Sequence, residues 1–446
     1  MRYVCDIILQ IRTVERNGGG MKLLLKGGQV FKDGGFHLSD VLISEGKVFL
    51  SSSFSQPDTF GAEVFDIKNK YVFPGFTDVH IHLREPGFSY KETALTGSLA
   101  AAAGGYTAVF AMPNVNPPPD SAERLRDMLE YYSRSAVCEV YQYGTITEGR
   151  RGECVAPLED MAEAVAFTDD GSGIQDESVM LEAMRRAAAM GKIIAAHCED
   201  ESLVRGGYIH DGEYAKSHGH RGICSESEWR PIERDIRLAA ETGCDYHVCH
   251  VSAKESVDII RKAKAAGIKI SAETAPHYLL LDDSMLEEDG RFKMNPPIRS
   301  AADREALIEG ILDGTIDMIA TDHAPHSAEE KSRGLEGSLM GVVGLECAFP
   351  ALYTGLVESG RISLEMLVDK MASVPAKRFG VSGGEIMDGG DADLCVFDLD
   401  SEYVINAEKF QSKGKCTPFD GMRVHGKCVM TVKKGNVIWR ENLTEK

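Results

Sequence analysis

The chain has 446 residues and carries 69 acidic against 49 basic side chains, so its formal net charge is −20. A hydrophobic fraction of 43% and a charged fraction of 26% fit a globular protein with a large core, and exclude collagen-like, disordered and disulfide-scaffold classes. The acidic balance argues against partners such as nucleic acids and anionic membrane surfaces, whose phosphates need basic patches.

Cysteine usage and the N-terminal sequence bear on the compartment. The 11 cysteines form no CxxC pair, and Cys198, Cys249 and Cys395 lie in apolar runs, as buried reduced thiols do. The first residues lack a cleavable signal peptide, and no apolar stretch is long enough to span a bilayer. We therefore expect a cytoplasmic protein without membrane association, in which residues 1–20 are a disordered extension ahead of Met21.

Short strand-like runs separated by glycine-containing turns lie near both ends of the chain. They occupy residues 21–73 and return in residues 381–446, where Lys434-Gly435-Asn436 has the composition of a hairpin turn. Such runs predict antiparallel β structure. We predict that the two segments together form one small β-sandwich domain.

Residues 74–380 have a different rhythm. Eight apolar β runs alternate with helical patterns, and glycines such as Gly191, Gly243 and Gly314 follow the helices as C-terminal caps. Strands that are apolar throughout are buried on both faces, as in a parallel sheet. The pattern predicts an α/β fold, a (β/α)8 TIM-type barrel. A doubly wound sheet would be expected to carry a glycine-rich phosphate loop after its first strand, and the sequence has none there.

Polar side chains stand where five of these β runs end. In a barrel these ends meet on one face, and alternation along the first strand places His80 and His82 on the same side. Four imidazoles and two carboxylates, one of them bridging, suit a pair of divalent ions such as Zn²⁺. Burying so many polar groups without a use would be costly. The residues in question are His80, His82, Asp169 or Asp170, His197, His250 and Asp322.

Seven motifs occur in an order that resembles a known family. They are FPGFTDVHIHLREPG, AMPN, AFTDDG, AAHCE, HVCHVS, MNPPIR and ATDHAPH. The set resembles the amidohydrolase superfamily and, within it, the bacterial type I dihydroorotases, over residues 21–440. This resemblance implies reversible hydrolysis of (S)-dihydroorotate to N-carbamoyl-L-aspartate in de novo pyrimidine (UMP) biosynthesis, with two Zn²⁺ ions per subunit.

The resemblance also implies a role for each motif residue. His80 and His82 would hold one metal together with Asp322, His197 and His250 would hold the second, and Asp170 would bridge them. Asp322 would also be the catalytic proton shuttle for a metal-bridging hydroxide that attacks the ring amide. The implied substrate contacts are Arg84, Asn114 and His326 for the exocyclic carboxylate, and Asn295, Met340 and Gly341 for the ring.

One segment departs from the family pattern. The family often has Pro-Phe-Gly where this chain has Leu339-Met340-Gly341, a segment whose backbone touches the substrate in the family. Backbone contacts survive side-chain changes, so we expect activity to persist with altered affinity or selectivity.

Two other functions compete with this interpretation. Related cyclic amidohydrolases (dihydropyrimidinase, hydantoinase, allantoinase) often place a carboxylated lysine at the bridge, and residues 164–177 contain no lysine. A non-catalytic partner of aspartate transcarbamoylase would be expected to have lost metal ligands, yet all six positions are filled. We expect a homodimer, with association with aspartate transcarbamoylase as a further option.

Overall fold

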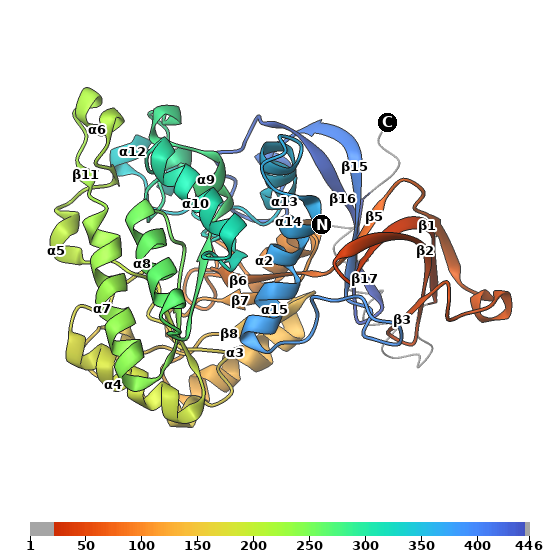
Figure 1. The fold of residues 1–446 in the computed structure, drawn as a ribbon, viewed down its shortest axis with the longest axis horizontal. Coiled ribbons are helices and arrows are strands. Elements are labelled where there is room, and N and C mark those ends of the chain that lie inside the picture. The colour runs from red at the N-terminus through yellow and green to blue at the C-terminus, as the bar shows by residue number, and fades with distance from the viewer. Residues whose placement is uncertain (1–21, 442–446) are drawn as a thin grey trace.

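A computed structural model describes residues 22–441 and places an α/β barrel beside a β-sheet domain (Figure 1). The prediction for residues 1–20 concerns a segment outside the described residues. Among residues 22–441, none of the helices combines the length and hydrophobicity needed to cross a bilayer.

Strands from both ends of the described chain share one sheet. Its strand order is β17-β16-β15-β5-β1-β2-β3, with β4 also paired to β1. The two ends join where β5 pairs antiparallel with β15, with Val72 opposite Val396. The strands are β1 (Leu23–Lys32), β2 (Gly35–Ser44), β3 (Lys47–Leu50), β4 (Glu63–Asp66), β5 (Tyr71–Pro74), β15 (Leu394–Val404), β16 (Arg423–Lys433) and β17 (Asn436–Arg440).

The hairpin between β16 and β17 has the predicted turn. Lys434 and Gly435 both have positive φ, 46° and 78°. Two such residues in a row form the type I′ turn whose twist matches that of the flanking strands.

The barrel strands run parallel, as the apolar runs predict. They are β6 (Phe76–Ile81), β7 (Tyr106–Ala111), β8 (Glu139–Gln142), β9 (Ile193–Ala196), β12 (Asp245–Val248), β13 (Ile270–Thr274) and β14 (Met318–Ile319). The fourth run is reduced to bridges from Phe167 to Gly144 and to Ile194. A parallel bridge between Ile81 and His323 joins the last run to the first and closes the barrel. This arrangement confirms the predicted fold class.

Helices cover the outside of the barrel (Figure 1). Gly191, Gly243 and Gly314 end their helices with left-handed φ, as predicted. The principal helices are α2 (Ala94–Ala103), α3 (Ala122–Ser135), α4 (Glu177–Met190), α7 (Glu226–Thr242), α8 (Lys254–Ala265), α10 (Ala301–Asp313), α14 (Leu364–Met371) and α15 (Ser373–Phe379). Shorter elements are α5 (Glu201–Val204), β10 (Ile209–His210), α6 (Glu213–His218), β11 (Gly222–Ile223), α9 (Pro276–Leu280), α11 (Ala328–Lys331), α12 (Gly334–Gly337) and α13 (Ala348–Leu352).

One helix begins earlier than its sequence suggests. Proline favours the first turn of a helix, which predicts a start at Pro231, but α7 begins at Glu226 and Pro231 lies inside it. A proline there leaves the carbonyl four residues earlier without its helical donor. That carbonyl, Ser227 O, accepts a hydrogen bond from the Asp200 N–H at 2.7 Å instead. The loop after β9 therefore satisfies the helix and makes an internal proline tolerable.

Aromatic rings pack where the barrel meets the sheet. Phe73, Phe76, Phe349 and Phe397 are buried, and the centroids of the Phe349 and Phe397 rings lie 4.3 Å apart.

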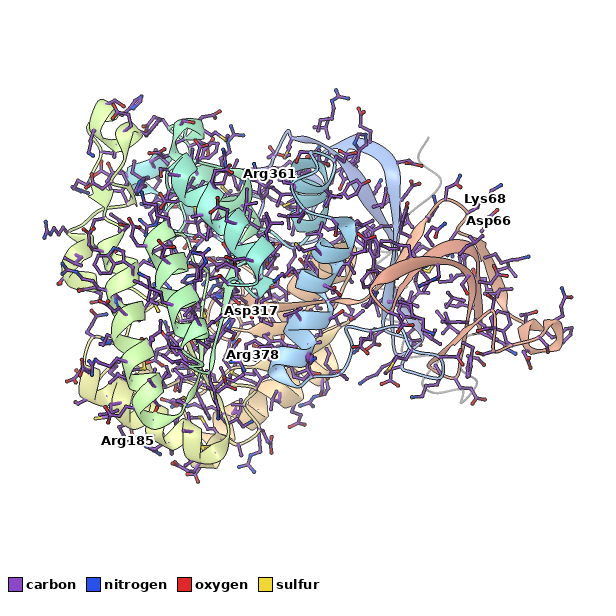
Figure 2. The ribbon with its side chains drawn as sticks, viewed as in Figure 1. Asp66, Lys68, Arg185, Asp317, Arg361 and Arg378 are labelled. Carbon is purple, nitrogen blue, oxygen red and sulfur yellow. The ribbon has the colours of Figure 1, made fainter. Side chains whose placement is uncertain are left out.

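An ion pair lies at the amino-terminal ends of the barrel strands. Arg378 binds the Asp245 carboxylate at 2.5 and 2.8 Å (Arg378 is labelled in Figure 2). The carboxyl ends are thereby left to carry the functional groups.

Candidate metal and substrate site

The six predicted metal ligands converge at the carboxyl ends of the barrel strands, around the Asp170 carboxylate. Its Oδ1 lies 3.3 Å from His80 Nε2, 3.6 Å from His250 Nε2 and 3.7 Å from His197 Nδ1. Its Oδ2 lies 3.6 Å from His82 Nε2. The two oxygens of one buried carboxylate thus face different histidines, which is the arrangement a bridging ligand needs.

Asp322 lies against His80 and His82, the two histidines of the first barrel run. Its Oδ1 lies 3.0 Å from His82 Nε2 and 3.5 Å from His80 Nε2. Asp322 and His250 both stand just beyond their strands and have positive φ, 48° and 35°. Such backbone is unfavourable for residues other than glycine, and strain of this kind gathers at functional sites.

Partners behind the histidines fix their orientation. His80 Nδ1 lies 2.6 Å from Glu273 Oε1, and His82 Nδ1 lies 2.8 Å from Asn114 Oδ1. A carboxylate or amide oxygen at Nδ1 requires a proton there, which leaves the Nε2 lone pair free to bind a metal. Sequence reasoning missed Glu273; the available signal was a charged residue inside an apolar strand, β13.

The electrostatics of the cluster favour a cation. Asp170, Asp322 and Glu273 are buried carboxylates. Burial opposes ionisation of Asp170, but the neighbouring His80, His250 and His82 outweigh it and hold its pKa well below the usual range. His80 Nε2 and Asp170 Oδ1 face each other, and both are buried without a hydrogen-bond partner. Two orphaned ligand atoms among nitrogen and oxygen donors fit divalent ions of the zinc type.

The predicted carboxylate-binding residues lie beside this cluster. Arg84 is buried, and its Nε donates to Pro325 O at 3.1 Å, which leaves both terminal nitrogens for a ligand. Its Nη2 lies 3.4 Å from His326 Nε2, which in turn lies 2.7 Å from Met340 O. Burial lowers the pKa of the Arg84 guanidinium to about 10, so it stays charged at neutral pH.

The predicted ring-binding residues occupy two loops. Gly341 has a φ of 130°, and a Cβ there would come within 2.7 Å of Ala324 O, so the segment after Met340 requires glycine. Asn295 donates through Nδ2 to Glu199 Oε1 at 2.9 Å. Glu199 Oε2 in turn lies 3.7 Å from His197 Nε2, so Asn295 is connected to the histidine–carboxylate cluster through a residue that the sequence did not single out.

Two polar residues next to the ligands turn away from the cluster. The Asp169 carboxylate accepts hydrogen bonds from the Ile146 and Thr147 backbone and from the Thr147 hydroxyl. His323 Nδ1 accepts from Gly344 N–H, and its Nε2 faces the buried Glu92. Of the Asp169–Asp170 pair, the structure therefore brings only Asp170 to the histidines.

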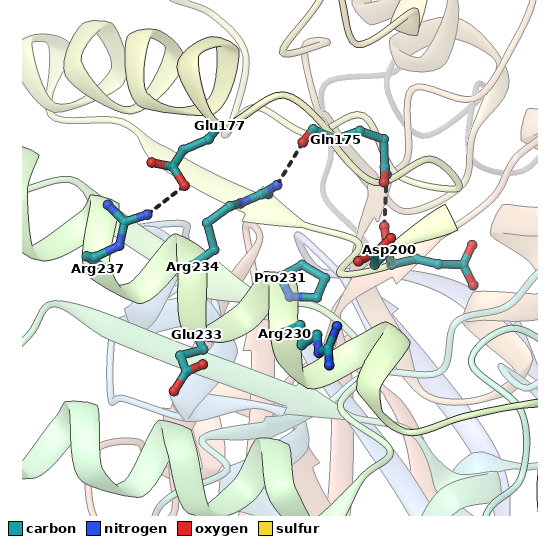
Figure 3. Close-up of a pocket in the computed structure, with 9 residues that line it drawn as sticks. Gln175, Glu177, Asp200, Arg230, Pro231, Glu233, Arg234 and Arg237 are labelled. Atoms are coloured by element: carbon teal, nitrogen blue, oxygen red, sulfur yellow. Dashed lines mark hydrogen bonds and ion pairs between the residues drawn. The ribbon is translucent and has the colours of Figure 1, made fainter. Parts of the chain in front are cut away.

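A cavity of about 650 Å³ is lined by Glu199 and by residues of α7 (Figure 3). Arg237 pairs with Glu177 at 2.6 Å, and Arg234 Nη1 donates to Gln175 O at 3.3 Å. Gln175 also donates to Glu199 O at 2.9 Å. These contacts brace the loops that follow Asp170 and His197.

Comparisons with known proteins identify relatives along nearly the whole chain. A family model described as "Dihydro-orotase-like" matches residues 69–256. A dihydroorotase from Bacillus caldolyticus is 48% identical over 425 residues, covering 94% of this chain and 99% of that protein. One from Bacillus cereus (strain AH820) is 47% identical with the same coverage. Among solved structures, the L-hydantoinase (dihydropyrimidinase) from Arthrobacter aurescens superimposes with a TM-score of 0.84 at 28% identity, covering 95% of this chain and 98% of that one.

Proposed function

The chain belongs to the dihydroorotase family, and from this we propose that it interconverts (S)-dihydroorotate and N-carbamoyl-L-aspartate in pyrimidine biosynthesis. The observation that carries the proposal is the Asp170-centred cluster with the paired donors Arg84 and His326 beside it. The cluster suits hydrolysis of an amide, and the donors suit the carboxylate that distinguishes dihydroorotate from uncharged cyclic amides.

We assign two zinc ions to the cluster. His80, His82 and Asp322 would hold one, since their ligand atoms lie within 4.8 Å of one another. His197 and His250 would hold the other, and Asp170 would be shared through its two oxygens. The bound ions would supply Lewis-acid activation of the ring amide.

Asp322 is the residue we assign to proton transfer. His82 and His80 lie on the side of Oδ1, so Oδ2 is the oxygen that we assign to the reacting groups. Burial opposes ionisation of Asp322, but the charges of His80 and His82 outweigh it and lower its pKa, which keeps the carboxylate in its base form. It would take a proton from the attacking water and deliver one to the departing ring nitrogen. The same carboxylate serves ring closure in the reverse direction.

Arg84, Asn114 and His326 are the residues we assign to the exocyclic carboxylate. Arg84 offers a planar fork of two nitrogens, the geometry that matches a carboxylate. His326 Nε2 is directed to the same place, and Asn114 keeps its amide nitrogen for the substrate while its oxygen binds His82. Asn295 and the Met340-Gly341 backbone would contact the ring.

The test is hydrolysis of dihydroorotate by the zinc-loaded protein, with dihydrouracil, hydantoin and allantoin as competing substrates. We expect turnover of dihydroorotate that is abolished by a chelator. Asp170→Asn should lose both turnover and bound metal, measured by elemental analysis, whereas Asp169→Asn should keep its metal. Turnover of an uncharged ring instead would point to a hydantoinase-type activity, which the name of the Arthrobacter relative makes the second candidate.

Three further assignments belong to the same proposal. We place the protein in the cytoplasm, because its relatives are named as a metabolic enzyme and its thiols are unpaired among the described residues. A homodimer and an association with aspartate transcarbamoylase remain predictions, which light scattering of the protein alone and with that enzyme would test.

A further inference from the structure

A buried lysine stands behind the carboxylate-binding histidine. Lys91 follows β6, and only 9% of its surface is exposed. Its ammonium lies 3.0 Å from Glu330 Oε1 and 3.2 Å from His326 Nδ1. Burying a charged lysine is costly even when it is paired, so this placement calls for an explanation.

The contacts of His326 define its protonation. An ammonium group has donors only, so Nδ1 of His326 must accept from Lys91. The proton of the neutral ring is then on Nε2, which is consistent with the carbonyl of Met340 at 2.7 Å from that atom. Both partners of the ring specify the same tautomer, the one with a donor on the side of Arg84.

Four charged groups face His326. Arg84, Lys91 and Lys331 supply positive charge, and Glu330 supplies the negative charge, with its Oε2 3.5 Å from His326 Nδ1. Burial, followed by the charges of Arg84 and Lys91, lowers the pKa of His326 to about 3. Without Lys91, Glu330 would face Nδ1 directly and favour a second proton on the ring.

Arg84 and His326 direct donors to the same place. Arg84 Nη2 and His326 Nε2 lie 3.4 Å apart, and the Nε2–H already donates to Met340 O at 2.7 Å. Two donors cannot satisfy each other, so an anion bound to Arg84 would share the Nε2–H of His326 with Met340 O.

We propose that Lys91 is a positioning residue that holds His326 as a neutral Nε2–H donor, aimed with Arg84 at the carboxylate of the substrate. The identity of that anion rests on the proposed function; the contact between Lys91 and His326 does not. Lys91 itself is balanced by Glu330, so its effect on the substrate passes through His326.

Two measurements on the full-length, zinc-loaded protein test the proposal. The first is NMR of protein with ¹⁵N-labelled histidine, in which His326→Gln identifies the His326 signals. We expect a neutral ring with its proton on Nε2 in the wild type throughout pH 6–8, and in Lys91→Met a ring whose proton is no longer confined to Nε2 and whose pKa is higher than in the wild type. A His326 whose tautomer and pKa are unchanged in the variant would overturn the proposal.

The second measurement is the pH profile of KM for dihydroorotate. In Lys91→Met at pH 8.5 the neutral ring has lost its anchor, and we expect KM to rise about tenfold with kcat within about twofold, the size of one hydrogen bond. Lys91→Arg should restore most of the wild-type value. A KM that is unchanged in Lys91→Met, or one that Lys91→Arg does not restore, would refute the positioning role.

A matched control separates these effects from general loss of a buried lysine. Lys433 is 7% exposed and pairs with Asp393 at 2.7 Å in the sheet domain. Lys433→Met should leave the His326 signals and the KM profile as in the wild type. If the wild type fails to turn over dihydroorotate, the proposed function is wrong, and the NMR result still decides whether Lys91 governs His326.

Discussion

Replacing Arg84 by alanine should remove selectivity for a charged substrate while leaving the chemistry intact. The guanidinium is buried, and two of its nitrogens are free to bind a carboxylate. Hydrogen bonds to charged groups contribute about 1.5–3 kcal/mol, so a lost fork corresponds to about 3 kcal/mol in transition-state binding. At about 1.4 kcal/mol per factor of ten, kcat/KM for dihydroorotate should fall about 100-fold.

Dihydrouracil provides the internal reference, because it has the same amide ring without the exocyclic carboxylate. Its kcat/KM should change less than about threefold in Arg84→Ala, measured by ring-opening assays under identical metal loading. Arg378→Ala is the control variant, because the guanidinium of Arg378 binds the Asp245 carboxylate at the opposite end of the barrel. Equal losses on both substrates would show that Arg84 supports the fold of the site rather than the carboxylate.

Three more outcomes are expected. Glu273→Gln should weaken metal affinity about 10–100-fold, because it loosens the 2.6 Å contact that orients His80. Competition with a chromophoric chelator measures this affinity, and an unchanged value would contradict the prediction. KM of the wild type for dihydroorotate should be flat between pH 6 and 8, since a pKa of His326 lowered to about 3 keeps the ring neutral there; a step near pH 6.5 would show an ordinary histidine. Phe397→Ala should cost about 3–5 kcal/mol of stability in urea unfolding, because the ring is buried among Phe73, Phe76 and Phe349; a cost below about 1 kcal/mol would show that the interface repacks.

The barrel and the clustering of the histidines and carboxylates at its strand ends were predictable because their signals are local. Apolar runs report buried strands, and the residues that end them report the functional face of a parallel barrel. His80 and His82 needed only the two-residue period of a strand. The member of the Asp169–Asp170 pair that faces the histidines also follows from that alternation once one direction is known.

Other features depended on contacts between distant parts of the chain. Glu273 supports His80 from 193 residues away, and no spacing rule connects them. Pro231 could be placed inside α7 only because Asp200 supplies the missing donor. Lys91 and Glu199 are ordinary charged residues in the sequence, and their significance appears only when His326 and Asn295 are brought against them.

The sheet shared by both ends of the chain has a consequence for how the protein is made. Phe73 on β5 and Cys395 on β15 are paired but lie 322 residues apart, so β5 cannot pair with β15 until the whole barrel has been synthesised. At about 5–20 residues per second the ribosome needs about 20–60 s for that stretch. During this time the strand pairs with β1 on one side and has an open edge on the other, the kind of edge that recruits other chains. Elongation speed, and any chaperone that covers β5 on the nascent chain, should therefore govern how much of the newly made protein reaches its native state.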